Sequence, residues 1–185
     1  MDTKETILSA ARAAAQAHGY GGLNFRDLAA QVGIKAASLH YHFPTKADLG
    51  AAVAKRYWQD TAAALEAMRG EMPNAGDCLR RYPSIFRRSL ENGNRMCLCS
   101  FMAAEFDDLP EAVRDEVENF ANINVSWLSE TLVAAGLTDP AEAEKRARAI
   151  FAAVSGAQLL ARSRADITLF DELVGSYRQA GLLPG

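Results

Sequence analysis

A chain of 185 residues in which 49% of the side chains are apolar can bury a proper core, as one compact unit or as two small helical layers. Its net charge of -3 excludes a protein that is basic over its whole surface. The segment after Met1 lacks the continuous apolar stretch of a signal peptide, and no later run approaches about 18 apolar residues. We therefore expect a cytoplasmic globular protein that does not cross a membrane.

The charge is distributed unevenly along the chain. Residues 1–50 contain five Lys/Arg against four Asp/Glu, a balance of +1, together with all three histidines. Residues 51–185 contain 15 Lys/Arg against 19 Asp/Glu, a balance of -4. A basic potential that suits a polyanionic partner is thus local to the first part of the chain. A binding region with so little positive charge generally needs a second copy of the chain, which doubles the number of contacts with the partner.

The first predicted helix runs to about His18, with Asp2 placed to cap its start and Gly19 placed to end it. The glycine-rich residues 19–22 are similar to a phosphate-binding loop in composition only. They follow a helix rather than a strand, and they lack the GxGxxG spacing. We interpret them as a connector.

Residues 24–49 have the pattern of two short helices joined by a tight turn, a helix-turn-helix. Asn24 can accept a hydrogen bond from the amide of Asp27, and Thr45 and Asp48 have the spacing of a capping box. Gly33 allows the turn between the two helices. Apolar residues on either side of that turn are spaced to form a small core, which leaves the other face of the second helix, at about 36–42, free.

The free face carries small side chains followed by hydrogen-bond donors, a combination that suits the major groove of DNA. We expect the base edges to be contacted by Lys35, Ala36, Ala37, Ser38 and His40. We expect the phosphates to be held by His42, Thr45 and Lys46. The predicted set of DNA-binding residues is completed by Arg26, which can reach a guanine, and by Asn24 and Tyr41.

The order of residues in FRDLAAQVGIKAASLHYHFPTKADL resembles the DNA-binding signature of TetR-family transcriptional regulators. The resemblance extends to upstream residues, namely Ile7, Ala10, Ala11, Gly19 and Tyr20. It is close over the first 50 residues and rests on length and helical layout beyond them. The family usually has a tyrosine at the position of His40. The resemblance implies a homodimeric regulator, in most cases a repressor, that leaves a palindromic DNA operator when a small molecule occupies its C-terminal domain.

Two simpler interpretations stay open, the first for this region and the second for the whole protein. Three short packed helices can present a merely solvated polar face, because such units often lack a nucleic-acid partner. A helical ligand carrier or interaction module that never touches DNA is the other. A metal site at His40 and His42 is disfavoured, since residues two apart on a helix point in different directions and no acidic or thiol partner lies near them.

Six further helices are predicted after residue 44, which gives an all-α chain of about nine helices. They span about 45–69, 77–91 with a kink at Pro83, 96–106, 110–135, from 140 onward, and after Asp166. We divide the chain into a DNA-binding domain at 1–48 and a helical effector-binding and dimerisation domain at 49–185. Apolar seams on the last two helices favour a four-helix interface between two subunits, although the same stripes could close the core of one subunit.

Aromatic residues after position 50 are numerous enough to line a pocket, and such a pocket favours a hydrophobic or flat ligand. The predicted ligand-binding residues are Tyr57, Tyr82, Phe86, Phe101, Phe120 and Trp127. The alternative is that most of them are ordinary core. The absence of G-x-S-x-G, H-E-x-x-H and paired-cysteine motifs indicates that the protein is not an enzyme and holds neither a metal nor another cofactor.

Cys97 and Cys99 lie in a predicted short helix, where thiols two residues apart cannot form a disulfide because their Cβ atoms diverge. In some TetR-family regulators a cysteine near this position senses electrophiles or oxidants, so the resemblance makes Cys97 a candidate sensor. The alternative, which we favour, is a small buried hydrophobic residue. A thiol-based repressor that acts through Cys97 is therefore the second hypothesis for the function.

Overall fold

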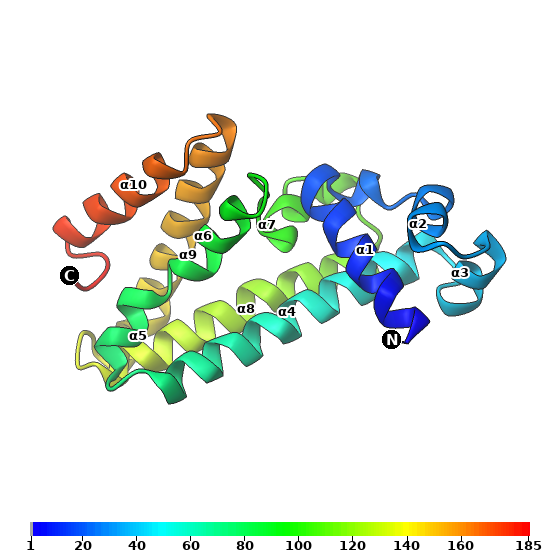
Figure 1. Ribbon diagram of the computed structural model, residues 1–185. Helices are drawn as coiled ribbons and strands as arrows, with labels where there is room; N and C mark the ends of the chain where they lie inside the picture. Colours follow the sequence, from blue (N-terminus) through cyan, green and yellow to red (C-terminus); the bar gives the residue numbers. More distant parts are fainter. Residues whose placement is uncertain (1) are drawn as a thin grey trace. The chain divides into compact units, whose positions relative to one another are not determined.

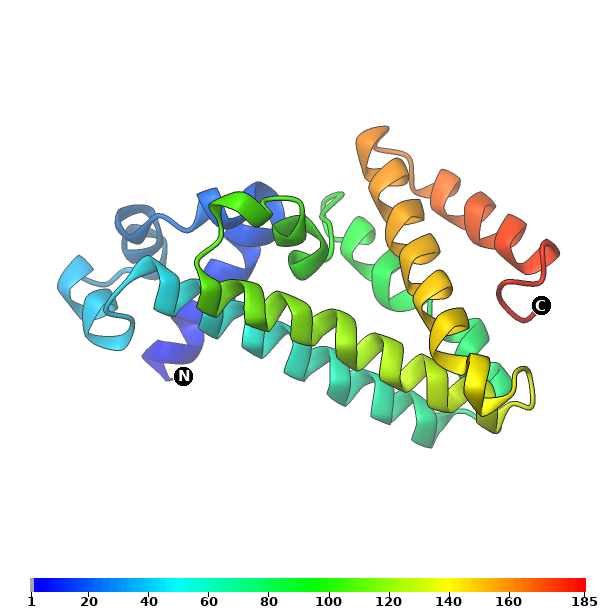
Figure 2. The same ribbon diagram turned by 180° about the vertical axis from the view of Figure 1, so that it is seen from behind.

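The computed structural model describes residues 2–185 and contains, within that range, ten α-helices, two 3-10 turns and no strand (Figures 1 and 2). The α-helices are α1 (Thr3–His18), α2 (Phe25–Val32), α3 (Ala36–His42), α4 (Lys46–Glu71), α5 (Ala75–Arg81), α6 (Ser84–Glu91), α7 (Leu98–Ala103), α8 (Glu111–Ala134), α9 (Pro140–Ser163) and α10 (Ile167–Gln179). The 3-10 turns are η1 (Tyr20–Gly22) and η2 (Phe106–Asp108). The all-α fold class predicted from the sequence is confirmed.

The helices form two compact units that do not follow the order of the chain. The first unit contains the residues up to Gln59 together with Leu98–Phe120. The second contains Asp60–Cys97 and Ala121–Gly185. The long helices α4 and α8 therefore contribute to both units. They run parallel and side by side, as Figures 1 and 2 both show.

In the first unit, α1 packs against α2, η1 and α7. Its inner stripe is fully buried, with Ile7 and Ala11 both at 0% exposure. The Arg12 guanidinium lies over the ring of Tyr57 at 4.7 Å from its centroid, and the Arg56 side chain of α4 reaches Glu5 of α1 at 2.9 Å. These contacts fix α1 on α4, and α1 then supports the helices that follow it.

In the second unit, α9 packs against α10 and α6 around a core of large aromatic side chains. The Tyr82 ring stacks on Trp127 at 5.8 Å, and its hydroxyl donates to Asn124 Oδ1 at 2.9 Å. Burial raises the pKa of Tyr82 well above its ordinary value, so this hydroxyl remains protonated and acts as a donor.

Gln158 provides a second buried polar contact in this unit. Its Oε1 accepts from the amide of Cys97 at 2.9 Å, and its Nε2 donates to the carbonyl of Phe86 at 2.6 Å. The side chain is at 0% exposure. One residue of α9 thus pairs two backbone groups that lie far from it in the sequence.

The structure corrects two predicted helices. The single kinked helix at 77–91 is two helices, α5 and α6, because Pro83 has no amide to donate and the chain turns through it. The helix predicted at 96–106 is shorter, since α7 covers only Leu98–Ala103 and the chain continues through η2. Both differences arise at short segments, where boundaries depend on tertiary contacts.

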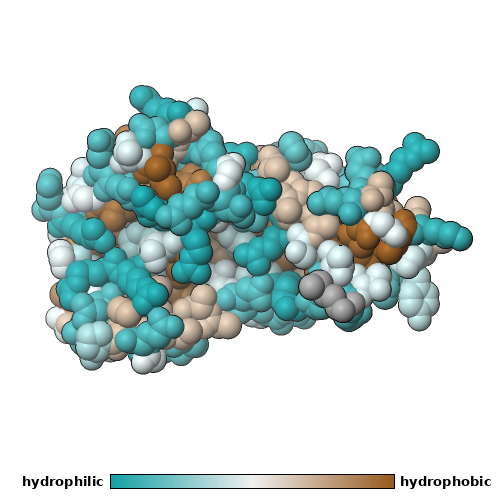
Figure 3. Space-filling model, in the orientation of Figure 1, coloured by the Kyte–Doolittle hydropathy of each residue, from teal (hydrophilic) through white to brown (hydrophobic). Residues whose placement is uncertain are grey.

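The surface is mostly hydrophilic on the face drawn in Figure 3, where hydrophobic residues form small separate patches. Across residues 2–185, no helix is both long and apolar enough to cross a membrane.

We predict that Gln158→Leu lowers the free energy of unfolding by roughly 2–4 kcal/mol, because it removes two buried hydrogen bonds while keeping the side-chain volume similar. Chemical denaturation of the two proteins measures the difference. The matched control is Gln179→Leu, which makes the same change at an exposed position and should cost less than about 0.5 kcal/mol. Equal losses for the two variants would contradict the structural role of Gln158.

Candidate nucleic-acid interface

The helix-turn-helix is held by local caps at each of its ends. Asn24 Oδ1 accepts from the amides of Arg26 at 2.9 Å and Asp27 at 3.3 Å, which starts α2. The Thr45 amide donates to Asp48 Oδ2 at 2.9 Å, and the Asp48 amide donates back to Thr45 Oγ1 at 3.1 Å. These two caps are the ones predicted from the sequence.

The turn between α2 and α3 depends on Gly33, which has φ 76° in the left-handed region. Its amide donates to the carbonyls of Ala29 and Ala30 and so ends α2. A residue with a side chain is strained at this φ, whatever space surrounds it. Glycine here therefore fixes the angle at which α3 leaves α2.

One side of helix α3 is buried, and its other side is exposed to solvent. Leu39 is at 0% exposure, and it is the buried residue of this helix. Residues Lys35, Ala36, Ala37, His40 and Tyr41 are exposed, and Ser38 is half-buried. Tyr41 is 85% exposed, the largest value among the exposed hydrophobic side chains of the described chain. The face predicted to contact DNA is thus presented to solvent.

The two histidines of α3 are held by different neighbours. The His40 ring packs on Phe25 with centroids 4.6 Å apart, and its Nδ1 lies 3.3 Å from the Pro44 carbonyl oxygen. The His42 ring lies edge-on to Tyr41 at 5.4 Å. If Nδ1 of His40 donates to that carbonyl, its Nε2 is an acceptor. Nowhere in residues 2–185 do three potential metal ligands gather.

Two cations of the motif, Arg26 and Lys35, are exposed and available to a polyanion. Within residues 2–185, neither Arg26 nor Lys35 forms an ion pair with a carboxylate. The Lys46 ammonium lies over the Tyr20 ring at 4.4 Å from its centroid, which holds it beside the start of α4. Thr45 is exposed next to it. This arrangement places positive charge at the edge of the motif, where phosphates would lie.

A carboxylate from outside the motif holds the connector between α1 and α2. Glu105 Oε2 accepts from the amide of Tyr20 at 2.7 Å, although the two residues are 85 positions apart. Gly19 has φ 66°, and a Cβ atom at that position would lie 2.3–2.6 Å from the Glu105 carboxyl group. Only glycine at position 19 permits so close an approach. The connector and Glu105 therefore form one structural element.

The ring of Tyr20 is fixed from the other side by α4 and α8. A Cβ atom at Gly50 would lie 2.7 Å from the Tyr20 ring and 3.1 Å from Val113. The ring consequently rests directly on the backbone of α4. Glu105, Gly50 and Val113 were not predicted as functional residues, because their contacts with the connector leave no signal in the local sequence.

The six aromatic residues predicted to bind a ligand lie mainly in the interior. Tyr57, Tyr82, Phe86, Phe120 and Trp127 are at most 5% exposed, and Phe101 is half-buried. Trp127 lines a groove between α4 and α8, together with residues that were not predicted. Tyr57 contacts Phe120 at 5.6 Å, and Tyr82 contacts Phe86 at 5.7 Å. The assignment of these residues to a ligand remains a prediction.

The three cysteines are all buried, with exposures of 1–2%. Burial raises the pKa of the Cys78 thiol. Reactive cysteines are generally accessible and have a lowered pKa, so burial favours the interpretation of Cys97 and Cys99 as small hydrophobic residues over that of a sensor.

We predict that Glu105→Ala speeds hydrogen exchange at the Tyr20 amide and lowers the free energy of unfolding by about 1–2 kcal/mol, because a charge-assisted hydrogen bond is lost. Exchange mass spectrometry and denaturation measure the two effects. Glu118→Ala is the control, since Glu118 is exposed on α8 and its removal should change neither quantity appreciably. Unchanged exchange at Tyr20 in Glu105→Ala would rule out the contact.

Comparison with known proteins assigns both parts of the chain. Residues 7–53 match the family described as bacterial regulatory proteins, tetR family. Residues 77–174 match the family described as transcriptional regulator LmrA/YxaF-like, C-terminal domain. No protein with curated annotation matches the sequence.

Solved structures agree with this assignment. A TetR transcriptional regulator from Legionella pneumophila is 32% identical, with 97% of each chain covered and a TM-score of 0.91. A TetR-family regulator from Agrobacterium tumefaciens is 29% identical, with 96% of each chain covered and a TM-score of 0.88. FadR from Bacillus subtilis in complex with stearoyl-CoA is 15% identical, covers 98% of each chain with a TM-score of 0.72, and shares the fold. The chain belongs to the TetR family of DNA-binding transcriptional regulators, which are not enzymes.

Proposed function

We propose that the protein is a cytoplasmic repressor that binds a palindromic operator as a homodimer and leaves it when a small molecule occupies the C-terminal domain. The observation that carries this proposal is the open face of α3, which is anchored by Leu39 and presents Lys35, Ala36 and Ala37 to solvent. Small side chains on that face allow α3 to approach the base edges in the major groove of DNA closely.

The contacts divide into two kinds. Lys35, Ala36, Ala37 and Ser38 read base edges from the first turns of α3, and Arg26 adds a guanine contact from α2. His40 presents an acceptor or donor at the next turn, according to its tautomer. Phosphates are held at the rim of the motif by Asn24, Tyr41, His42, Thr45 and Lys46.

Helices α9 and α10 form the proposed dimer interface. They pack on one another within the second unit, and α9 exposes Leu159 at 52% and Leu160 at 50%. Adjacent leucines so exposed on one helix favour burial against a second copy. A homodimer of this kind reads two half-sites about one helical turn of DNA, or 34–36 Å, apart.

Release of the operator requires a ligand that distinguishes two arrangements of the protein. A complete switch needs a preference of roughly 10⁴-fold, or about 5.5 kcal/mol, for the arrangement that does not bind DNA. Contacts with helices α4 to α9 can supply such a preference, and FadR, which shares the fold, is solved with stearoyl-CoA bound. Neither the thiol sensor nor the carrier without DNA is favoured by the structure or by family membership.

We predict that Lys46→Ala weakens binding to every duplex alike and lowers the slope of log affinity against log salt by about 1, because one phosphate contact is lost. Both effects are measured by titrating the protein with duplex DNA from the region upstream of its own gene. Random duplex is the competitor, and the titration is done at two salt concentrations. Lys46→Arg should restore most of the affinity, and Lys145→Ala, which removes an exposed side chain of α9, should change nothing.

Ser38→Ala and Lys35→Ala should instead alter which sequence is preferred, each by roughly 1–3 kcal/mol at one base pair. Binding-site selection from randomised duplexes measures the preference. A protein that binds no duplex specifically at either salt concentration, or a Lys46→Ala variant with an unchanged salt slope, would argue against the proposed docking of α3.

A further inference from the structure

The Tyr20 ring lies on one face of α4, against two residues that are one helical turn apart. A Cβ atom at Gly50 would lie 2.7 Å from Cε2 of the ring and 3.3 Å from its Cδ2, so the ring rests on the backbone there. The Lys46 ammonium lies over the same ring, 4.4 Å from its centroid. Residues four apart on a helix share a face, and one aromatic ring therefore contacts both positions.

The Tyr20 ring is itself held from outside α4. The Tyr20 amide donates to Glu105 Oε2 at 2.7 Å, which fixes the backbone from which the ring projects. The residue is half-buried, and burial raises the pKa of its hydroxyl above the ordinary value. Tyr20 is therefore neutral at physiological pH, and its attraction to the ammonium is a cation–π contact rather than an ion pair.

This contact restricts Lys46 without occupying it. A free lysine side chain loses much of its rotamer entropy when a phosphate immobilises it. Lys46 is already half-buried, with its ammonium placed over the ring. Within residues 2–185, no carboxylate forms an ion pair with Lys46. A phosphate oxygen can therefore accept from the ammonium without displacing an acidic partner, and part of the cost of ordering the side chain is already met.

We propose that Tyr20 is a positioning residue for DNA binding, whose ring holds the Lys46 ammonium where a phosphate of the duplex accepts from it. This inference rests on the function proposed above. Tyr20 itself contacts neither a base nor a phosphate, and it acts through Lys46. Loss of the ring therefore weakens binding without changing which sequence is preferred, because phosphate contacts carry no sequence information.

The test is a double-mutant cycle on the duplex affinity of the full chain, built from Tyr20→Leu and Lys46→Ala. Tyr20→Leu should weaken binding to the preferred duplex roughly twofold to fivefold for each bound copy of the chain, the size of one exposed cation–π contact. In the Lys46→Ala background the same change should have no effect. A loss of equal size in that background would show that Tyr20 supports the whole motif, and would overturn the proposal. Tighter binding by Tyr20→Leu would also overturn it, because the ring would then compete with the phosphate.

A second series keeps the shape of the ring, since leucine does not fill the space of an aromatic side chain on α4. Tyr20→Phe should bind duplex like the wild-type chain, because it retains the ring face. Phenylalanines with successively more fluorine atoms, incorporated at position 20, withdraw electron density from that face and should weaken binding stepwise. Affinity that does not respond to fluorination would contradict the cation–π role.

Sequence preference gives a further readout that a general loss of structure would change. Binding-site selection with Tyr20→Leu should return the same preferred sequence as the wild-type chain. A different preferred sequence would mean that α3 has moved, and would rule out an action through Lys46 alone.

The position of Lys46 is measured separately, by NMR spectroscopy of the protein without DNA. Protons above the face of an aromatic ring resonate upfield, so the Cε protons of Lys46 should be shifted upfield in the wild-type chain and in Tyr20→Phe, and should lose that shift in Tyr20→Leu. An unshifted signal in the wild-type chain would refute the contact. Absence of specific duplex binding by the wild-type chain would instead refute the proposed function, and with it any role of Tyr20 in DNA binding. Specific binding that Tyr20→Leu leaves unchanged would overturn the role of Tyr20 alone.

Discussion

The contact between the Glu105 carboxylate and the Gly19–Tyr20 connector is the constraint on which the arrangement of the helix-turn-helix depends. Helices α2 and α3 are short, and α3 buries Leu39 alone, so neither is stable without support from its surroundings. The connector receives that support at two points, the 2.7 Å bond to Glu105 and the packing of Tyr20 on Gly50. Because α1, the connector and Glu105 are fixed to one another, the exposed face of α3 has a defined direction.

Buried polar pairs have the corresponding role in the second unit. An apolar helical core tolerates sliding of one helix along another, whereas a buried hydrogen bond is made in one register only. Gln158 pairs with the Cys97 amide and the Phe86 carbonyl, and Tyr82 pairs with Asn124. The N–H of Trp127 differs from these satisfied groups, because it has no hydrogen-bond partner within residues 2–185 although the side chain is only 4% exposed.

The features that could be predicted from the sequence are those whose partners lie within a few residues. Asn24 caps α2 through residues two and three positions away, and Thr45 and Asp48 cap each other across three positions. The partner of Glu105 is 85 positions away, and those of Gln158 are 61 and 72 away. No local pattern encodes such pairs. Pro83 falls between these cases, since the sequence marks the position of the break but not whether the chain bends or separates into two helices.

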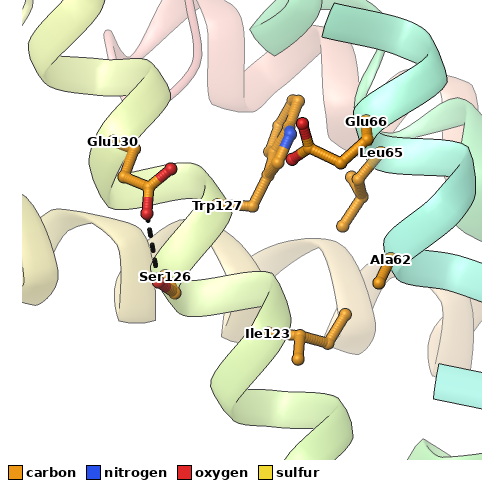
Figure 4. Close-up of a pocket in the computed structure, with 7 residues that line it drawn as sticks. All are labelled: Ala62, Leu65, Glu66, Ile123, Ser126, Trp127 and Glu130. Carbon is orange, nitrogen blue, oxygen red and sulfur yellow. Dashed lines mark hydrogen bonds between the residues drawn. The ribbon is translucent and has the colours of Figure 1, made fainter. Parts of the chain in front are cut away.

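The same reasoning explains why the exposed face of α3 could be predicted from the sequence and the groove between α4 and α8 (Figure 4) could not. Exposure of α3 follows from the spacing of its apolar residues, which is a property of one segment. A groove depends instead on how side chains from different helices pack together, including which buried aromatic N–H and O–H groups find acceptors on other helices. Tyr82 and Trp127 both carry one donor and both are buried, yet Tyr82 donates to Asn124 while Trp127 borders open volume. In sequence the two residues are equivalent candidates for a ligand site. Only the packing of the helices separates the buried donor that finds an acceptor from the one that does not.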